Sequence, residues 1–270
     1  MSPQFSVLLA TYKNDDATFL CEALESLAIQ TLPASEVVLV EDGPITQELE
    51  DTIHSFESRL PLKRISLEKN SGVGISAAYG METCQHELVA RMDADDICLP
   101  DRFEKQVRYM ESHPEIDVLG GWIAEFATNT PNNTLLRKTP LMHEDIKKIM
   151  TWRNPINHVT VMFRKSAVIN SGNYQQHKNV VDWMLWLRML INNKRFENMP
   201  DIFVKVRTGD GLIQRRRGIQ YFKSERWIAS WLRKKRLITL PQYLKHILVR
   251  AFPRLLPISI LKVIYKISRK

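Results

Sequence analysis

The chain has 270 residues, of which 44% are hydrophobic and 25% are charged. This balance fits a globular protein and excludes a disordered or fibrous one. Its three cysteines, Cys21, Cys84 and Cys98, form no C-x-x-C pair, so we expect no disulfide framework and a reducing cytosol. We expect no signal peptide, because the first residues lack a basic segment, and no membrane-spanning helix, because no stretch approaches roughly 18–20 uncharged apolar residues.

The net charge of +8 is unevenly distributed along the chain. Residues 215–270 hold 16 Lys and Arg and a single acid, Glu225, which gives +15. Residues 1–214 hold 22 basic and 29 acidic residues, which gives −7. A strongly basic tail on an acidic body predicts an anionic partner, either a nucleic acid or an anionic membrane surface.

The first hundred residues alternate between strand and helix patterns. Continuous apolar runs are typical of strands buried on both faces, and Leu20, Leu24 and Leu27 recur at helical spacing. The expected strands are residues 5–10, 37–40, 63–67 and 88–92, and the expected helices lie around residues 20–27, 46–56 and 73–83. This order predicts an α/β fold with a mostly parallel, doubly wound sheet, whose ligands bind at the carboxyl ends of the strands.

The rest of the chain is less regular. The expected elements are a strand at 117–126, a polar loop at 127–133, helices at 143–152 and 180–191, and a last strand at 202–206. From about Gly218 we expect helices interrupted at Pro241, Pro253 and Pro257, with apolar residues mixed among Lys and Arg. That profile is typical of basic amphipathic helices on a membrane surface. A helical cap packed on the rest of the protein is the alternative, and both can hold at once.

An acidic cluster of Asp93, Asp95 and Asp96 directly follows the predicted strand at 88–92. Three carboxylates within four positions repel one another unless a cation or basic groups lie between them. Mg²⁺ typically uses one or two carboxylates together with substrate phosphates, so the cluster suits a metal–diphosphate complex. An ordinary acidic turn is the alternative for this D-x-D triplet, and Asp96 fits better as a negative charge at a helix start.

Several segments resemble, in order and spacing, family 2 glycosyltransferases. Those similar to the nucleotide-sugar half are SVLLATYK (6–13), VLVEDG (38–43), KNSGVG (69–74) and MDADD (92–96). Those similar to the acceptor half are NPINHVTVMFR (154–164) and VDWMLWLR (181–188). The resemblance covers roughly residues 5–210 and is strongest to bacterial enzymes that assemble O-antigen, capsule or exopolysaccharides such as amylovoran. It implies the GT-A fold, a Mn²⁺ or Mg²⁺ cofactor and a single displacement that inverts the anomeric centre.

The resemblance assigns nucleotide-binding roles residue by residue. Thr11 matches the position that contacts the base, and Asp42 matches the carboxylate that binds the base or ribose. Asn70 and Gly72 match the loop that approaches the nucleotide, with a helix-capping turn as the alternative. Asp93 matches the residue that faces the ribose and the metal.

The remaining assignments concern the metal and the chemistry. Asp95, with Asp93, matches the metal ligands; His158 either joins them or is a hydrogen-bonded core histidine. Asp182 matches the catalytic base that takes the proton of the acceptor hydroxyl, with a solvated helix N-cap as the alternative. Val181 departs from the Glu that usually precedes this Asp.

The resemblance also implies an organisation and a substrate class. Residues 1–214 form the GT-A catalytic domain, with the nucleotide-sugar half at 1–100 and the acceptor half at 101–214. Residues 215–270 form the basic, membrane-associated helical tail. The implied donor is a UDP-hexose, with UDP-Gal or UDP-Glc favoured, and the implied acceptor is an undecaprenyl-diphosphate-linked sugar. Such an enzyme is expected to be peripheral, at the cytoplasmic face of the bacterial inner membrane.

Two other functions fit parts of the pattern. A sugar nucleotidyltransferase also binds a metal and a nucleotide, but it normally has a Gly-rich loop after the first strand, where this chain has ATYK at residues 10–13. A nucleic-acid-binding protein could use the basic tail, but no nucleic-acid motif is present. Nucleic acid is therefore the less favoured partner.

Overall fold

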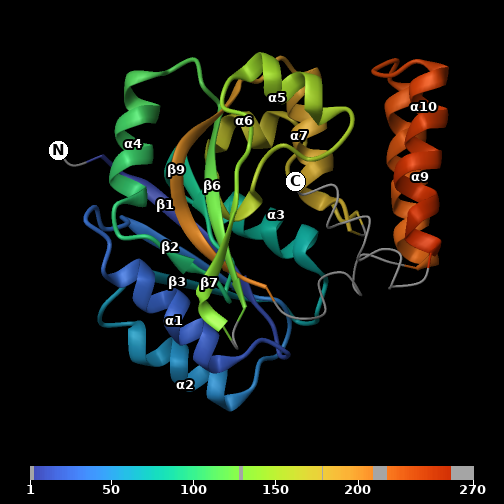
Figure 1. Cartoon of the computed structure of the whole chain (residues 1–270). Coiled ribbons are helices and arrows are strands. Elements are labelled where there is room, and N and C mark those ends of the chain that lie inside the picture. The colour runs from blue at the N-terminus through green and yellow to red at the C-terminus, as the bar shows by residue number, and fades with distance from the viewer. Residues whose placement is uncertain (1–2, 128–129, 178, 209–217, 257–270) are drawn as a thin grey trace.

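The computed structural model describes residues 3–127, 130–177, 179–208 and 218–256. Its described strands form one sheet in the order β3-β2-β1-β4-β8-β6-β9-β5, and β7 pairs with β6 (Figure 1). The strands are β1 (Phe5–Thr11), β2 (Glu36–Glu41), β3 (Leu62–Ser66), β4 (Leu88–Arg91), β5 (Ile97–Cys98), β6 (Val118–Ala127), β7 (Thr130–Arg137), β8 (Met162–Arg164) and β9 (Phe196–Arg207).

Helices cover both faces of this sheet (Figure 1). The α-helices are α1 (Ala17–Ala28), α2 (Gln47–Phe56), α3 (Val73–Thr83), α4 (Arg102–Ser112), α5 (His143–Met150), α6 (Lys165–Asn170), α7 (Val181–Ile191), α9 (Ile219–Lys234) and α10 (Leu240–His246). Three shorter segments are the 3-10 helix η1 (His158–Thr160), the π-helix η2 (Ile247–Ala251) and the 3-10 helix η3 (Phe252–Leu255).

The first four strands are parallel, as predicted. β1 pairs with β2 on one side and with β4 on the other, and β2 pairs with β3. Parallel neighbours need crossover connections, which α1, α2 and α3 supply. The carboxyl ends of β1, β2 and β4 therefore meet at one edge of the sheet. Beyond β4 the sheet is mixed, because β8 runs antiparallel to both β4 and β6.

Alternate residues of the buried strands belong to two hydrophobic layers. Val7 and Leu9 of β1 face the layer that contains α1, α2 and α4, whereas Leu8 faces the layer that contains α3, α5, α6 and α7. This follows from the two-residue period of a strand, whose successive side chains point to opposite faces. The predicted α/β architecture, a mostly parallel sheet flanked by helices, is confirmed.

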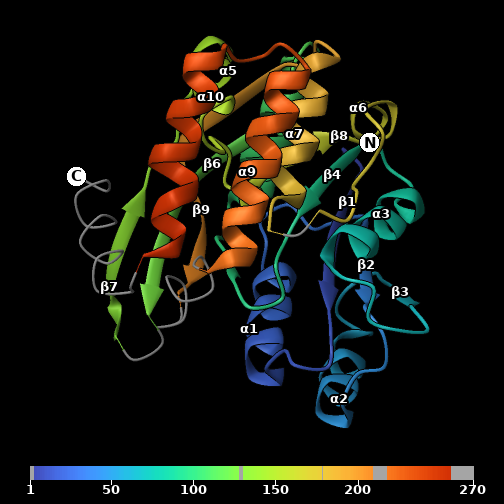
Figure 2. The same ribbon diagram turned by 90° about the vertical axis from the view of Figure 1, so that its right-hand side faces the viewer.

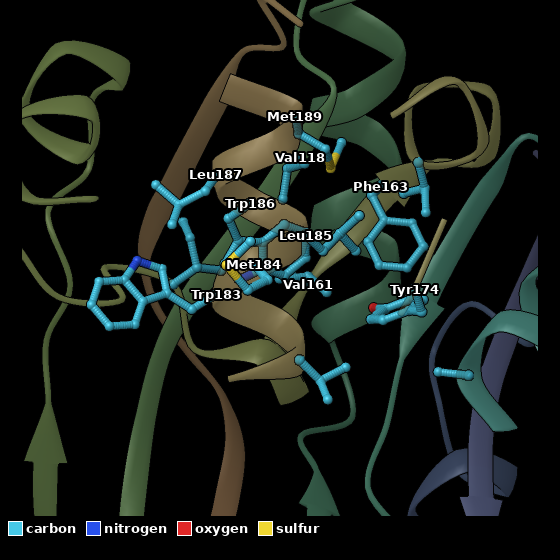
Figure 3. Close-up of a cluster of buried hydrophobic side chains, with 14 of the residues drawn as sticks. Val118, Val161, Phe163, Tyr174, Trp183, Met184, Leu185, Trp186, Leu187 and Met189 are labelled. Atoms are coloured by element: carbon cyan, nitrogen blue, oxygen red, sulfur yellow. The ribbon is translucent and has the colours of Figure 1, made fainter. Parts of the chain in front are cut away.

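Helix α7 is apolar around most of its circumference, which is typical of a helix covered on all sides. Its side chains pack with Val118, Val161, Phe163 and Tyr174 from neighbouring segments (Figure 3). Trp186 is fully buried, and the indole N–H of Trp183 donates a 2.7 Å hydrogen bond to the carbonyl of Met150. This packing fixes the start of α7 relative to the sheet.

The C-terminal helices pack on the body of the protein. α9 and α10 lie side by side along one flank of the molecule (Figure 2). Ile228, Leu232 and Ile238 belong to the same hydrophobic cluster as α7. The expected helical cap is therefore present in the described part of the tail. No helix among residues 218–256, or elsewhere in the described chain, is both long and apolar enough to cross a bilayer.

Several sequence predictions were wrong in detail. The polar loop expected at 127–133 is replaced from Thr130 onward by β7, whose backbone pairs antiparallel with β6. The last strand is longer than 202–206, because β9 pairs with β6 on one side and β5 on the other. β5, α4, β8 and α6 were not predicted.

Pro241 and Pro253 start helices instead of interrupting them. Pro241 and Pro253 lie in the first turns of α10 and η3, where the missing N–H of proline costs nothing. The side chain of Thr239 forms a capping box with Gln242 at the start of α10. Pro257 and the expected domain boundary between residues 214 and 215 lie outside the described residues.

Candidate active site

A cavity of about 330 Å³ opens at the edge of the sheet where β1, β2 and β4 end. Its lining includes every residue that we expected to bind the nucleotide-sugar, and the two expected metal ligands: Thr11, Asp42, Asn70, Gly72, Asp93 and Asp95. The fold therefore brings together residues that are up to 84 positions apart in the chain. Ligands of open α/β sheets bind at this kind of edge.

Asp42 holds the loop that we expected to approach the nucleotide. Its Oδ1 accepts a 2.7 Å hydrogen bond from the N–H of Ser71, and its Oδ2 accepts a 2.9 Å hydrogen bond from the N–H of Gly72. The side-chain amide of Asn70 donates to the Asp42 carbonyl at 3.2 Å. The buried carboxylate thus shapes the loop, and each oxygen keeps a lone pair for a further donor.

Gly72 ends this loop and is the N-cap of α3. Its φ of +91° is in the left-handed region, and an added Cβ would lie 2.5 Å from Nε2 of Gln176. The Oε1 of Gln176 accepts a 2.8 Å hydrogen bond from the N–H of Gly74, in the first turn of α3. Gly72 is therefore required by its backbone conformation and by the close approach of Gln176. Gly72 thus occupies a helix-capping position, and its expected contact with the nucleotide stays a prediction.

Three carboxylates gather near the cavity floor. Asp15, Asp93 and Asp95 all line the cavity, and burial followed by the charges of Asp93 and Asp15 raises the pKa of Asp95 to about 6. Asp15 accepts hydrogen bonds from the Thr11 hydroxyl at 3.0 Å and from the Tyr12 N–H at 3.1 Å. Burial raises its pKa as well, despite these bonds. Sequence reasoning missed Asp15, whose position after the first strand was the available signal.

Arg91 is a second residue that sequence reasoning missed. Its guanidinium is buried and forms a 2.7 Å ion pair with Oδ1 of Asp93. Another guanidinium nitrogen lies 3.4 Å from the carbonyl of Leu8. An arginine at the end of an otherwise apolar strand was the signal for this role. The ion pair orients Asp93 and leaves its second oxygen available to a ligand.

The donor set fits a hard divalent cation that takes further ligands from its substrate. No three His, Cys, Asp or Glu side chains in the described residues are arranged to hold a metal by themselves. Asp93 and Asp95 nevertheless supply oxygen ligands, and with Asp15 they concentrate negative charge that a cation would relieve. Mg²⁺ and Mn²⁺ suit oxygen ligands, and Mg²⁺ commonly pairs one or two carboxylates with substrate phosphates and water.

The surroundings of His158 differ from those expected of a metal ligand, and the surroundings of Asp96 differ from those expected of a charge at a helix start. Nε2 of His158 is 2.8 Å from the Tyr174 hydroxyl, and its ring packs edge-on against Trp186. Burial lowers the pKa of His158, and its contacts with Tyr174 and Trp186 fit the hydrogen-bonded core alternative. Asp96 is buried and accepts a 2.8 Å hydrogen bond from the N–H of Arg207. β5 follows it directly, so the expectation of a charge at a helix start was wrong for Asp96.

Asp182, the predicted catalytic base, lies in the first turn of α7. Its Oδ2 accepts a 2.6 Å hydrogen bond from Nδ2 of Asn154. The Oδ1 of Asn154 accepts from the N–H of Ile156 at 3.0 Å, which fixes the orientation of the amide. The charges of Arg91, Asp182 and Asp93 all act on the buried His158 ring. Asn154 was part of a recognised motif, but sequence reasoning assigned it no role.

Solved structures similar to this chain establish the fold class. The S. aureus TarS fragment 1-349 in complex with UDP-GlcNAc has a TM-score of 0.67 at 21% identity, over 84% of this chain and 66% of that one. The mannosyltransferase PcManGT from Pyrobaculum calidifontis, in complex with GDP-Man and Mn²⁺, has a TM-score of 0.63 at 16% identity. That match covers 93% of this chain and 70% of the other. The fold is GT-A, as the sequence resemblance implied.

Sequence relatives then define the family. The model of glycosyl transferase family 2 matches residues 6–172. The amylovoran biosynthesis glycosyltransferase AmsE of Erwinia amylovora is 40% identical over 98% of this chain and 99% of its own length. The UDP-Gal:alpha-D-GlcNAc-diphosphoundecaprenol beta-1,3-galactosyltransferase of Escherichia coli is 35% identical over 98% of this chain and 96% of its own.

The chain belongs to glycosyltransferase family 2. This family membership confirms the predicted hexosyltransferase class and excludes the alternative of a sugar nucleotidyltransferase.

Proposed function

We propose that the enzyme transfers a hexose from a UDP-sugar, UDP-Gal or UDP-Glc, to a hydroxyl of an undecaprenyl-diphosphate-linked sugar. The reaction belongs to repeat-unit assembly of a bacterial O-antigen, capsule or exopolysaccharide. The observation that carries the proposal is the gathering of Thr11, Asp42, the 70–72 loop, Asp93 and Asp95 around one cavity. The names of two near full-length relatives support the substrate class: one names UDP-Gal and a diphosphoundecaprenol acceptor, and the other names amylovoran biosynthesis.

On the donor side, the residues that line the cavity would bind the nucleoside diphosphate of the UDP-sugar. The 70–72 loop, held by Asp42, approaches the nucleotide, and Thr11 lies at the base end. Asp93 and Asp95 would hold Mn²⁺ or Mg²⁺. The bound metal would act as a Lewis acid that neutralises the charge developing on the departing diphosphate. Arg91 keeps Asp93 in position through their 2.7 Å ion pair.

On the acceptor side, Asp182 is the general base. Asn154 occupies its Oδ2, which leaves Oδ1 to accept the proton of the acceptor hydroxyl. As that proton moves to Asp182, the hydroxyl oxygen bonds to the anomeric carbon and the bond to the diphosphate breaks on the opposite face. The configuration is therefore inverted, as in inverting glycosidases, with a sugar hydroxyl in the place of water.

The proposed location is the cytoplasmic face of the bacterial inner membrane, where the protein is peripheral. A lipid-linked acceptor resides in that membrane, and the charge of +15 on residues 215–270 favours an anionic leaflet. An anionic membrane surface is accordingly a proposed partner of the tail.

A screen of UDP-sugars tests the proposed reaction. The purified protein is incubated with each donor, Mn²⁺ or Mg²⁺, and a synthetic GlcNAc-diphosphate-lipid acceptor, and released UDP and glycosylated acceptor are quantified. We expect UDP release with UDP-Gal or UDP-Glc that requires both metal and acceptor and is abolished by a chelator. Pyrophosphate release, or transfer unaffected by the chelator, would contradict the proposal.

A further inference from the structure

The helical rod of residues 240–255, formed by α10, η2 and η3, carries an apolar stripe on its outer side. Apart from one adjacent pair, its members recur every three or four positions, which places them on one side of a helix. Each exposes 46% to 65% of its surface. The stripe consists of Leu240, Leu244, Leu248, Val249, Phe252 and Leu255. Contiguous exposed apolar surface of this kind marks an interaction site.

The opposite side of the same rod is already used for packing. His246 and Ala251 are buried, and Tyr243 packs against the hydrophobic cluster that contains α7. The guanidinium groups of Arg250 and Arg254 bind the carboxylate of buried Glu225 of α9, at 2.9–3.0 Å. The rod is therefore attached to the body by one face, while the stripe faces away from it.

The described tail that carries the stripe, residues 218–256, has exposed cations and no exposed acid. Residues 218–256 contain nine Lys and Arg and one acid, Glu225, which is 1% exposed and paired internally. Seven of the nine cations are exposed, and four of them are consecutive at residues 233–236, a run that ends four positions before Leu240, the first residue of the stripe. A second copy of the chain would bring an equally cationic face against this one, and the like charges would repel. An anionic lipid surface complements both the charge and the apolar stripe.

The inner face of the rod reaches the helix of the proposed catalytic base. The guanidinium of Arg250 lies 5.2 Å from the ring centroid of Trp183, and the His246 ring stacks on the same indole at 6.2 Å. Trp183 directly follows Asp182 at the start of α7. One layer of side chains thus separates the stripe from the helix that carries Asp182.

We propose that the stripe of residues 240–255 is a membrane-docking surface that lies in the interface of a bilayer containing anionic lipids. Its apolar side chains enter the acyl boundary, and the cations at 233–236 and Lys245 contact the headgroups. This inference deepens the proposed function and rests on it for the lipid-linked acceptor. Docking through this face holds the acceptor half of the enzyme at the membrane, where a lipid-linked sugar is presented.

Vesicle flotation of the full-length protein tests the docking surface. The variant Leu244→Gln/Leu248→Gln removes the centre of the stripe. The matched control, Ile29→Gln/Leu135→Gln, changes two residues of similar exposure (54% and 61%) in α1's C-cap and β7. A third variant, Arg233→Gln/Lys234→Gln, removes charge only. Each protein is tested on phosphatidylglycerol–phosphatidylethanolamine vesicles and on phosphatidylcholine vesicles.

We expect the wild type and the control to float with the anionic vesicles and not with phosphatidylcholine. Loss of the contacts that two exposed leucines make with the bilayer should weaken binding roughly tenfold or more. The charge variant should weaken binding at low salt and lose that effect at high salt. Equal binding by the stripe variant and the control would overturn the proposal. So would a wild-type dimer that the stripe variant dissociates, because a second copy would then occupy the stripe.

A parallel assay separates this inference from the proposed reaction. Transfer to a short-chain, water-soluble diphosphate acceptor should be the same in the wild type, the stripe variant and the control, which also shows that all three are folded. If the wild type shows no transfer to any acceptor but the vesicle results are as expected, the proposed reaction fails and the docking surface stands.

Discussion

The side-chain amide of Asn154 donates a 2.6 Å hydrogen bond to Oδ2 of Asp182, and the N–H of Ile156 fixes which end of that amide faces the carboxylate. The two residues are 28 positions apart and lie in the two segments that resemble the acceptor half of the family. Asn154 is thus a positioning residue for the proposed base, since it holds one carboxylate oxygen and leaves the other for the acceptor.

Replacing Asn154 should therefore reduce turnover more than substrate binding. A hydrogen bond to a charged group contributes about 1.5–3 kcal/mol, so Asn154→Ala should lower kcat by roughly tenfold to a hundredfold. The KM for the UDP-sugar should stay within about twofold, because Asn154 does not line the donor cavity. Steady-state kinetics measure both values, and Asn154→Ser, which keeps a donor, should recover part of the rate. An increase in KM with unchanged kcat would show that Asn154 has a different role.

Gly72 offers a test of the nucleotide loop with a matched control. Gly72→Ala adds a Cβ at a φ of +91° and 2.5 Å from Gln176, whereas Gly172→Ala has a similar φ of +86° but only a 3.4 Å contact with Gln175. Strain of about 1–3 kcal/mol in the loop should weaken UDP-sugar binding by roughly tenfold or more. Calorimetric titration of both variants with the donor measures this effect. Equal affinities in the two variants would remove the loop from the donor site.

His246 makes stability depend on pH. Burial, followed by the charge of Arg250, lowers its pKa to about 4, while nearby Glu225 acts in the opposite direction. The ordinary pKa of histidine is about 6.5, so on acidification the unfolded chain takes up a proton near pH 6.5 and the folded chain does not until about pH 4. The free energy of unfolding that depends on His246 is therefore at its maximum above pH 6.5, and it falls by up to about 3 kcal/mol as the pH drops to 4.

Urea unfolding at several pH values measures that dependence. His246→Phe should flatten the decline between pH 6.5 and pH 4, whereas His54→Gln, at an exposed position of α2, should leave it unchanged. An unaltered decline in His246→Phe would assign the pH dependence to other groups.

The strands and site residues that were predicted correctly are those that the local sequence pattern determines. β1, β2 and β4 were predicted because their residues are apolar on both faces, and Asp93 and Asp95 follow one such strand directly. β7 was missed because it is a polar edge strand that gains its partner only from β6 in the folded chain. Apolar spacing in one segment carries no information about such pairing.

Site residues whose roles depend on side-chain contacts were harder to predict, even where the partner is close in sequence. Arg91 pairs with Asp93, two positions further on, and Asp15 accepts a hydrogen bond from Thr11, four positions earlier. In the tail, composition indicated a membrane surface but not which side chains face it. Tyr243 and Trp231 pack against the core, whereas Leu244 and Leu248 stay exposed. That division follows from the docking of α9 and α10 on α7, which only the tertiary structure shows.

Activity of Asp182→Asn is the most direct test of the proposed mechanism. Transfer from the UDP-sugar to the lipid-diphosphate acceptor is measured in single turnover, together with calorimetric binding of the donor in the presence of Mn²⁺. Asp145→Asn, an exposed substitution in α5, is the control. We predict that Asp182→Asn loses transfer by roughly two to four orders of magnitude while donor affinity is preserved, because the base acts on the acceptor alone. Transfer at the wild-type rate in Asp182→Asn would contradict the assignment of the catalytic base.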